Sequence, residues 1–194
     1  SPDLEHLFSE YQRAVLPNQE QLLPTSRGIM IKMCGLLADR RYFPETIITA
    51  SSQFKTLFEQ NVIDLEADEE MPSLTFAVNV ETGSPVLAVP PDYIGQIKAD
   101  AAYQLGIVAY HASFLADYFN GKIVDGLSQM EAIYRARAGE AEVILTIKSL
   151  GVQEKFGWQW NETQMFILQQ FPHGLKSLPD QITQLRRQAR ARFN

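Results

Sequence analysis

The chain has 194 residues, of which 45% are hydrophobic and 21% charged, and its formal net charge at pH 7 is -6. This composition is typical of a globular protein of one domain and excludes extensive disorder. The negative net charge disfavours nucleic acid as a partner of the protein as a whole. The sequence has no run of about 20 apolar residues that would predict a membrane span.

The chain contains a single cysteine, Cys34, which excludes an intramolecular disulfide. Its neighbours are apolar, so we expect a small buried hydrophobic residue rather than a reactive thiol. The polar and acidic first residues show no signal-peptide pattern. These features fit the cytoplasm or another reducing, soluble compartment.

Three helices are predicted in the first third of the chain, each beginning at a capping residue or a proline. The first starts at Ser1 and ends at Pro17, the second starts near Pro24, and the third starts at Pro44. The acidic run 64–70 follows and has five acids in seven residues. It lacks the glycine and the distal glutamate of a calcium loop, so we interpret it as a solvated loop.

The next segment, about 73–90, predicts an antiparallel β-hairpin. Leu74, Phe76, Val78 and Val80 alternate with less apolar residues, a turn follows at 82–84, and the return strand covers 86–89. A lone two-stranded hairpin is marginally stable in water. Its apolar face must therefore lie against the helices or pair with another strand, such as that of a second copy.

The longest helical pattern spans about 92–119 and carries apolar stripes around most of its circumference. Such a helix is usually buried among others. We therefore predict a mainly α fold, a multi-helix bundle around this central helix with the hairpin inserted before it. Residues 1–194 are expected to form one domain.

The following helix is predicted to begin at Ser128, which stands at capping-box spacing from Glu131, and to run to about Leu150. Gly139 in its middle costs about 1 kcal/mol relative to alanine, which would allow a kink or break there. Charged residues of this helix are interpreted as structural pairs at helical spacing: Glu131 with Arg135, and Arg137 with Glu140.

The C-terminal part contains two tryptophans and two helices. Trp158 and Trp160 could cover the core or form an interface anchor. Asn161, with Gln164 at capping-box spacing, predicts a short helix. The last helix, opening near Ser177, carries four arginines opposite its apolar face: Arg186, Arg187, Arg190 and Arg192.

No catalytic or metal-binding motif is found in the sequence. The histidines His6, His111 and His173 do not stand at metal-ligand spacing on one helix, and neither a metal nor a cofactor is predicted. Asp100, Gln104 and His111 fall on one side of the central helix. They could be an acid/base set, could orient a ligand, or could form a hydrogen-bonded polar strip.

The leading functional hypothesis is a non-enzymatic protein that acts through contacts with a protein partner or in a homo-oligomer. The residues predicted to carry these contacts lie in the hairpin and the last helix: Leu74, Phe76, Val78, Val80, Arg186, Arg187 and Arg190.

An alternative hypothesis is a binding module for an apolar or aromatic small molecule held between helices. Tyr103 and Tyr110 would contact the ligand, while Asp100, Gln104 and His111 would orient it. An enzyme that uses Asp100 and His111 ranks third, because no catalytic constellation accompanies them.

Overall fold

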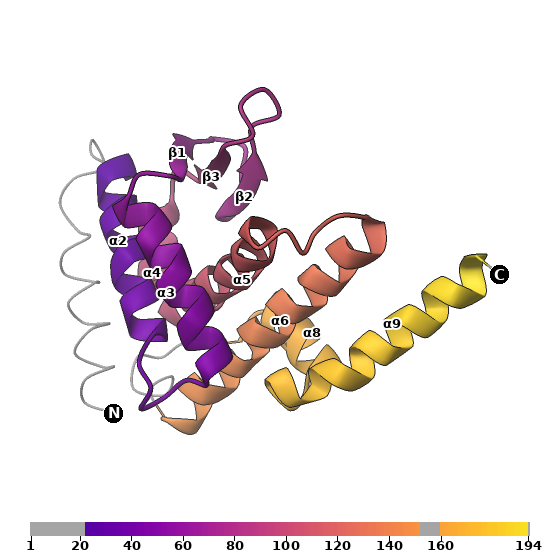
Figure 1. The fold of residues 1–194 in the computed structure, drawn as a ribbon. Helices are drawn as coiled ribbons and strands as arrows, with labels where there is room; N and C mark the ends of the chain where they lie inside the picture. The colour runs from indigo at the N-terminus through magenta and orange to yellow at the C-terminus, as the bar shows by residue number, and fades with distance from the viewer. Residues whose placement is uncertain (1–21, 152–159, 194) are drawn as a thin grey trace.

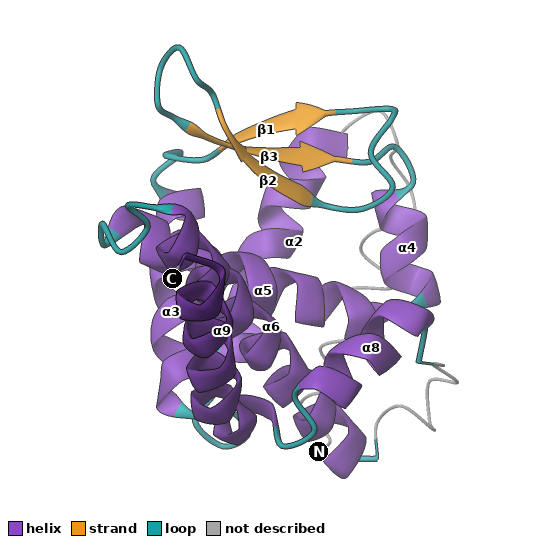
Figure 2. Cartoon of the chain, turned by 90° about the vertical axis from the view of Figure 1, so that its right-hand side faces the viewer, coloured by secondary structure: helices purple, strands orange, loops and turns teal. Residues whose placement is uncertain are grey.

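The structure is a computed structural model and describes residues 22–151 and 160–193. Within these residues the chain forms a bundle of α-helices with a three-stranded sheet over one end (Figures 1 and 2), so the predicted mainly α fold is confirmed. The elements in chain order are α2 Leu22–Leu37, α3 Glu45–Glu59, β1 Asp64–Ala67, β2 Thr75–Val78, β3 Pro85–Val89, α4 Tyr93–Ala99, α5 Ala101–Phe119, α6 Gly126–Ser149, α8 Glu162–Gln170, a 3-10 helix Gly174–Ser177 and α9 Leu178–Phe193.

The sheet contains the predicted hairpin and one strand that we did not predict. β2 and β3 pair antiparallel with Phe76 opposite Leu87, and β1 pairs parallel with β3 on the other side with Leu65 also opposite Leu87. The first half of the expected acidic loop is therefore strand β1, so that expectation was wrong there. The strand forms because the backbone of β3 pairs with residues 64–67. The sequence of residues 64–67 alone does not indicate this pairing.

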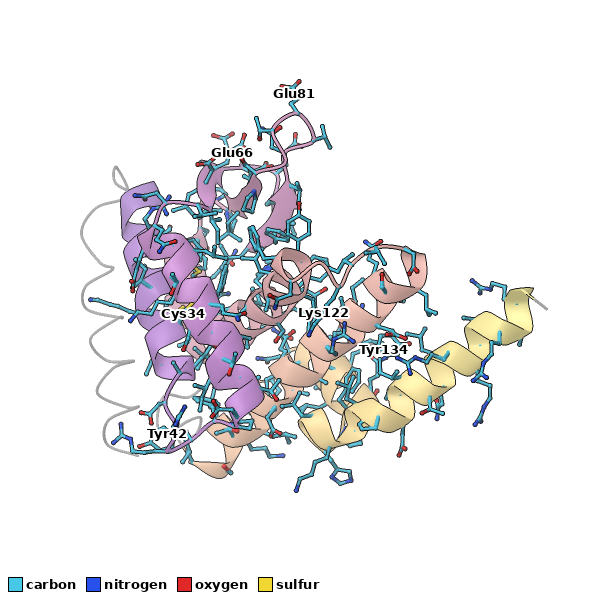
Figure 3. The ribbon with its side chains drawn as sticks, in the orientation of Figure 1. Cys34, Tyr42, Glu66, Glu81, Lys122 and Tyr134 are labelled. Atoms are coloured by element: carbon cyan, nitrogen blue, oxygen red, sulfur yellow. The ribbon has the colours of Figure 1, made fainter. Side chains whose placement is uncertain are left out.

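The acidic residues of β1 lie on the solvent-exposed edge of the sheet. Asp64 and Glu66 are exposed at its edge, whereas Leu65 packs against the core. Figure 3 shows Glu66 and Glu81 pointing away from the helices. Charged side chains on an edge strand discourage pairing with another chain, so β1 completes the sheet without offering an apolar edge.

The predicted central helix is divided into α4 and α5 at Asp100. Asp100 has φ -151° and ψ 77°, outside the helical region, and its carboxylate accepts a hydrogen bond from the Tyr103 backbone N–H at 2.9 Å. Aspartate is a strong N-cap because it satisfies a backbone donor that a helix start leaves free. The expectation of one continuous helix was therefore wrong at this residue.

The core surrounds α5, which packs against α2, α3 and α6. Its apolar positions are at most 1% exposed over most of its length: Ala101, Ala102, Leu105, Val108, Ala109, Ala112 and Leu115. Cys34 of α2 is fully buried in the same core, as predicted, and burial raises the pKa of its thiol far above the usual range.

α6 runs from Gly126 to Ser149 without a break at Gly139. A Cβ atom at Gly139 would stand 3.2 Å from Ser113 Oγ and 3.3 Å from Ile47 Cδ1. The glycine therefore lets α6 approach α5 and α3 closely, and this packing offsets its low helix propensity.

The start of α6 also differs from the expectation. Asp125 and Ser128 form the capping box, because the Asp125 carboxylate accepts from the Ser128 N–H at 2.7 Å and Ser128 Oγ accepts from the Asp125 N–H at 2.9 Å. Glu131 instead accepts from Arg186 of α9 at 2.6 Å. Its predicted pair with Arg135 is present at 3.9 Å.

The C-terminal helices follow the prediction more closely. Asn161 and Gln164 form the expected capping box at the start of α8. Phe171 is buried against Tyr134 of α6, with ring centroids 6.0 Å apart. Trp160 packs partly buried on the core, whereas Trp158, His6 and the helix predicted from Ser1 lie outside the described residues.

Candidate ligand-binding site

A partly open cavity of about 440 Å³ lies where β2, α5, α6 and α8 meet. Aromatic and aliphatic side chains form most of its wall, and Phe76 of β2 is fixed there by edge-to-face contacts with Phe114 at 5.8 Å and Tyr118 at 6.1 Å between ring centroids. The other apolar lining residues come from α5, α6, α8 and the residue before β2: Leu74, Ile107, Phe114, Ile133 and Ile167.

Three of the five residues that we predicted to contact a ligand line this cavity, namely Tyr103, Tyr110 and His111. Asp100 and Gln104 do not. Asp100 caps α5, and burial raises the pKa of its carboxyl group. Gln104 is 1% exposed, and its Oε1 has no hydrogen-bond partner within the described residues. The predicted polar strip is therefore divided between a helix cap, the core and the cavity wall.

His111 contributes a neutral imidazole to the wall. Burial lowers its pKa to about 4, and its Nε2 lies 3.2 Å from the carbonyl oxygen of Leu74. Because a carbonyl only accepts, the proton of the neutral ring belongs on Nε2 and Nδ1 is an acceptor. No described group of the protein donates to this buried Nδ1.

Glu140 is the functional candidate that sequence reasoning missed. It lines the cavity and is only 4% exposed, although we interpreted it as a member of a pair with Arg137. That ion pair does not form in the described structure. Burial raises the pKa of the Glu140 carboxyl to about 8, against the opposing effect of the Arg137 charge, so the group is mostly protonated at neutral pH.

A signal for the burial of Glu140 was present in the sequence. Glu140 lies in register with Ala136 and Ile144, both of which are fully buried on α6. An acid at helical spacing within a stripe of small and apolar residues faces the core rather than solvent. Buried carboxyl groups with a raised pKa are concentrated at functional sites, although structural ones also occur.

A second cavity, of about 380 Å³, is a weaker candidate because its charged groups already form ion pairs. Asp117 accepts from Arg135 Nε at 2.9 Å and lies 3.8 Å from Lys122 Nζ. These side chains already satisfy one another. The first cavity, by contrast, contains a buried polar atom, His111 Nδ1, that has no hydrogen-bond partner among the described residues.

The residues predicted to bind a protein partner lie in two separate parts of the molecule, the hairpin and α9. Leu74 is buried and Phe76 packs on α5, while Val80 lies beyond β2 and is 96% exposed. On α9, Arg186 pairs with Glu131, and Arg187 and Arg190 are exposed. Partner binding by these residues stays a prediction.

In the described part of the chain, no three potential His, Cys, Asp or Glu ligands gather closely enough to hold a metal ion. The helices of this part also lack the combination of length and apolar character that a membrane crossing needs. Comparisons with protein-family models, curated proteins and solved structures found no match. The functional assignment therefore rests on the residues of the cavity itself.

Proposed function

We propose that the protein is a binding module for a small apolar or aromatic molecule, held in the cavity between β2, α5, α6 and α8. The observation that carries the proposal is the composition of the cavity wall. The cavity has a volume of about 440 Å³, which lies within the range of ligand sites, roughly 300–1,000 Å³. Ligand sites of this size are typically apolar with a few placed polar groups, as this one is.

The polar groups in the wall favour binding over a purely structural role. His111 Nδ1 is buried and receives no hydrogen bond from the described residues, and the side chain of Glu140, which is 4% exposed, forms no hydrogen bond with them. A buried polar group without a partner costs about 1–3 kcal/mol. A ligand that carries its own polar groups would supply these partners when it enters the cavity.

The proposal is tested by filling the cavity from its exposed side. Thr163 lines the cavity from α8 and is exposed, so Thr163→Trp adds bulk without disturbing the core. The matched control is Gln53→Trp, because Gln53 is an exposed helical residue that lines the second cavity. The probe is N-phenyl-1-naphthylamine, a neutral aromatic dye whose fluorescence rises in apolar surroundings, excited beyond the absorption of tryptophan.

We expect the wild type and Gln53→Trp to bind the dye saturably with one site and equal affinity, and Thr163→Trp to bind it at least about tenfold more weakly. Equal binding by the two variants would place the dye elsewhere and contradict the proposal. The absence of saturable binding to the wild type would also contradict it.

Self-association is a second candidate function, favoured by the distribution of charge. Arg187 and Arg190 are exposed on α9, whereas Asp64 and Glu66 are exposed on the edge strand β1. Opposite charges on two distant surfaces could join one copy to the next. Sedimentation velocity at rising concentration tests this, with Arg187→Glu/Arg190→Glu expected to abolish any oligomer. A monomer at all concentrations contradicts it.

A further inference from the structure

Two ionisable side chains of α6, Arg137 and Glu140, line the cavity one helical turn apart. Side chains at this spacing lie on the same face of a helix. Among residues 22–151 and 160–193, no hydrogen bond or ion pair joins either side chain to another residue, although their charges interact at longer range. The wall therefore holds a guanidinium and a carboxyl group that form no hydrogen bond with the described residues of the protein.

The charge of the cavity follows from the titratable groups that face Glu140. From α5, the phenols Tyr103 and Tyr110 have a pKa raised by burial, and His111 has a pKa of about 4, so all three are neutral at pH 7. β2 and α8 contribute no titratable side chain to the described lining. With Glu140 mostly protonated, Arg137 gives this cavity a positive charge in a protein whose net charge is -6.

We propose that the ligand is an organic acid whose apolar or aromatic body lies against Phe76 and Phe114 and whose carboxylate lies between the Arg137 guanidinium and the Glu140 carboxyl. The inference rests on the proposed function, because it names the class of ligand that the cavity takes. The guanidinium donates to a carboxylate in a fixed fork. The neutral Glu140 carboxyl donates its O–H to the same carboxylate, a strong charge-assisted hydrogen bond.

The other two charge classes fit the wall less well. A cationic ligand would meet the like charge of Arg137 and would require Glu140 to lose its proton in a buried site. A neutral ligand would leave the charge of the Arg137 guanidinium without a counter-ion. An anion neutralises this charge and also accepts the proton of the Glu140 carboxyl in a hydrogen bond.

The test compares three probes that share a naphthalene ring and differ in charge: naphthalene-2-carboxylate, 2-naphthalenemethanol and 2-naphthylmethylammonium. Each is used to displace N-phenyl-1-naphthylamine from the full chain at pH 7. We expect the carboxylate to bind about tenfold or more tightly than the alcohol, the effect of one hydrogen bond to a charged group. The ammonium probe should bind most weakly.

Variants then locate the source of the preference. Arg137→Gln should remove the advantage of the carboxylate over the alcohol. The control is Lys148→Gln, which removes the same charge from an exposed site on α6 and should retain the preference. Raising the pH from 7 to 9 should weaken carboxylate binding to the wild type as Glu140 ionises, without changing alcohol binding.

The outcomes separate this inference from the proposed function. Equal affinity for the three probes, or a preference for the ammonium probe, would overturn the inference while leaving the cavity as a binding site. Failure of the wild type to bind the dye or any of the probes would overturn the proposed function. The ranking of probes on the wild type and its pH dependence decide the matter even where Arg137→Gln does not fold.

Discussion

Gly106 of α5 faces Glu140 of α6 so closely that a Cβ atom on Gly106 would stand 3.1 Å from Glu140 Cγ and 3.4 Å from Oε1. The missing side chain at residue 106 thus leaves the space through which the Glu140 stem reaches the cavity wall. Gly106 is itself buried in the middle of a helix, where glycine is intrinsically unfavourable. The close approach between α5 and α6 is what makes glycine the suitable residue here.

We predict that Gly106→Ala stabilises the fold less than a glycine-to-alanine change at an open helical site. Gly28 of α2 supplies the comparison, because a Cβ there would meet no atom within 4 Å. Gly28→Ala should raise the free energy of unfolding by about 0.5–1 kcal/mol. Gly106→Ala should gain less or lose stability, since it displaces Glu140. Urea denaturation measures both, and equal gains would contradict the close contact.

The raised pKa of Glu140 predicts a specific dependence of stability on pH. Between its ordinary value of 4.5 and about 8, the unfolded chain releases a proton that the folded chain retains. The free energy of unfolding then falls as the pH rises, with a slope approaching ~1.4 kcal/mol per pH unit. Glu140→Gln removes this loss. Its stability relative to the wild type should grow from pH 5 to pH 8 in urea denaturation, and parallel curves would show that the pKa of Glu140 is not raised in the folded state.

The lowered pKa of His111 predicts the opposite slope at lower pH. Between about 4 and 6.5, the unfolded chain binds a proton that the folded chain does not, so His111 destabilises the fold as the pH falls through this range. His111→Gln retains a donor for the Leu74 carbonyl and does not titrate. The stability of the wild type relative to this variant should therefore rise from pH 4 to pH 6.5 and then stay level. A constant difference would mean that the ring is accessible to protons in the folded state.

Removal of the α5 cap should destabilise the fold. Asp100→Ala deletes the acceptor for the Tyr103 N–H, at a cost of about 0.5–2 kcal/mol. Asp100→Asn keeps an acceptor and should cost less. Asp92 is the matched control, because it stands at the N-cap of α4 without a side-chain capping bond. Thermal unfolding should rank Asp100→Ala below Asp92→Ala, and the reverse order would contradict the capping role.

The contact between α9 and α6 should depend on one arginine among four. Arg186 donates to both carboxylate oxygens of Glu131, at 2.6 and 3.2 Å, and these hydrogen bonds lower the pKa of Glu131. We expect Arg186→Ala to speed amide hydrogen exchange within α9, and Arg187→Ala to leave it unchanged. Equal exchange in the two variants would show that apolar contacts alone hold the helix.

The cavity could be predicted only in part. Tyr103, Tyr110 and His111 were identified because helical spacing places them on neighbouring faces of α5. Glu140 was missed because local spacing to Arg137 suggested a surface pair, although its register with Ala136 pointed inward. Asp100 was assigned to the ligand site because one long helix was expected, whereas its side chain satisfies the first turn of α5.

Features that depend on neighbours along the chain could be read from the sequence alone. The helical class, the hairpin and the Asn161 capping box follow from periodicity and from side chains within a few residues of the backbone groups they satisfy. Strand β1, the uninterrupted course of α6 through Gly139 and the burial of Glu140 were decided by the tertiary structure. Each depends on a partner that is distant in the sequence: β3 for strand β1, α3 and α5 for Gly139, and Gly106 for Glu140. Local sequence patterns do not indicate which distant segments come into contact.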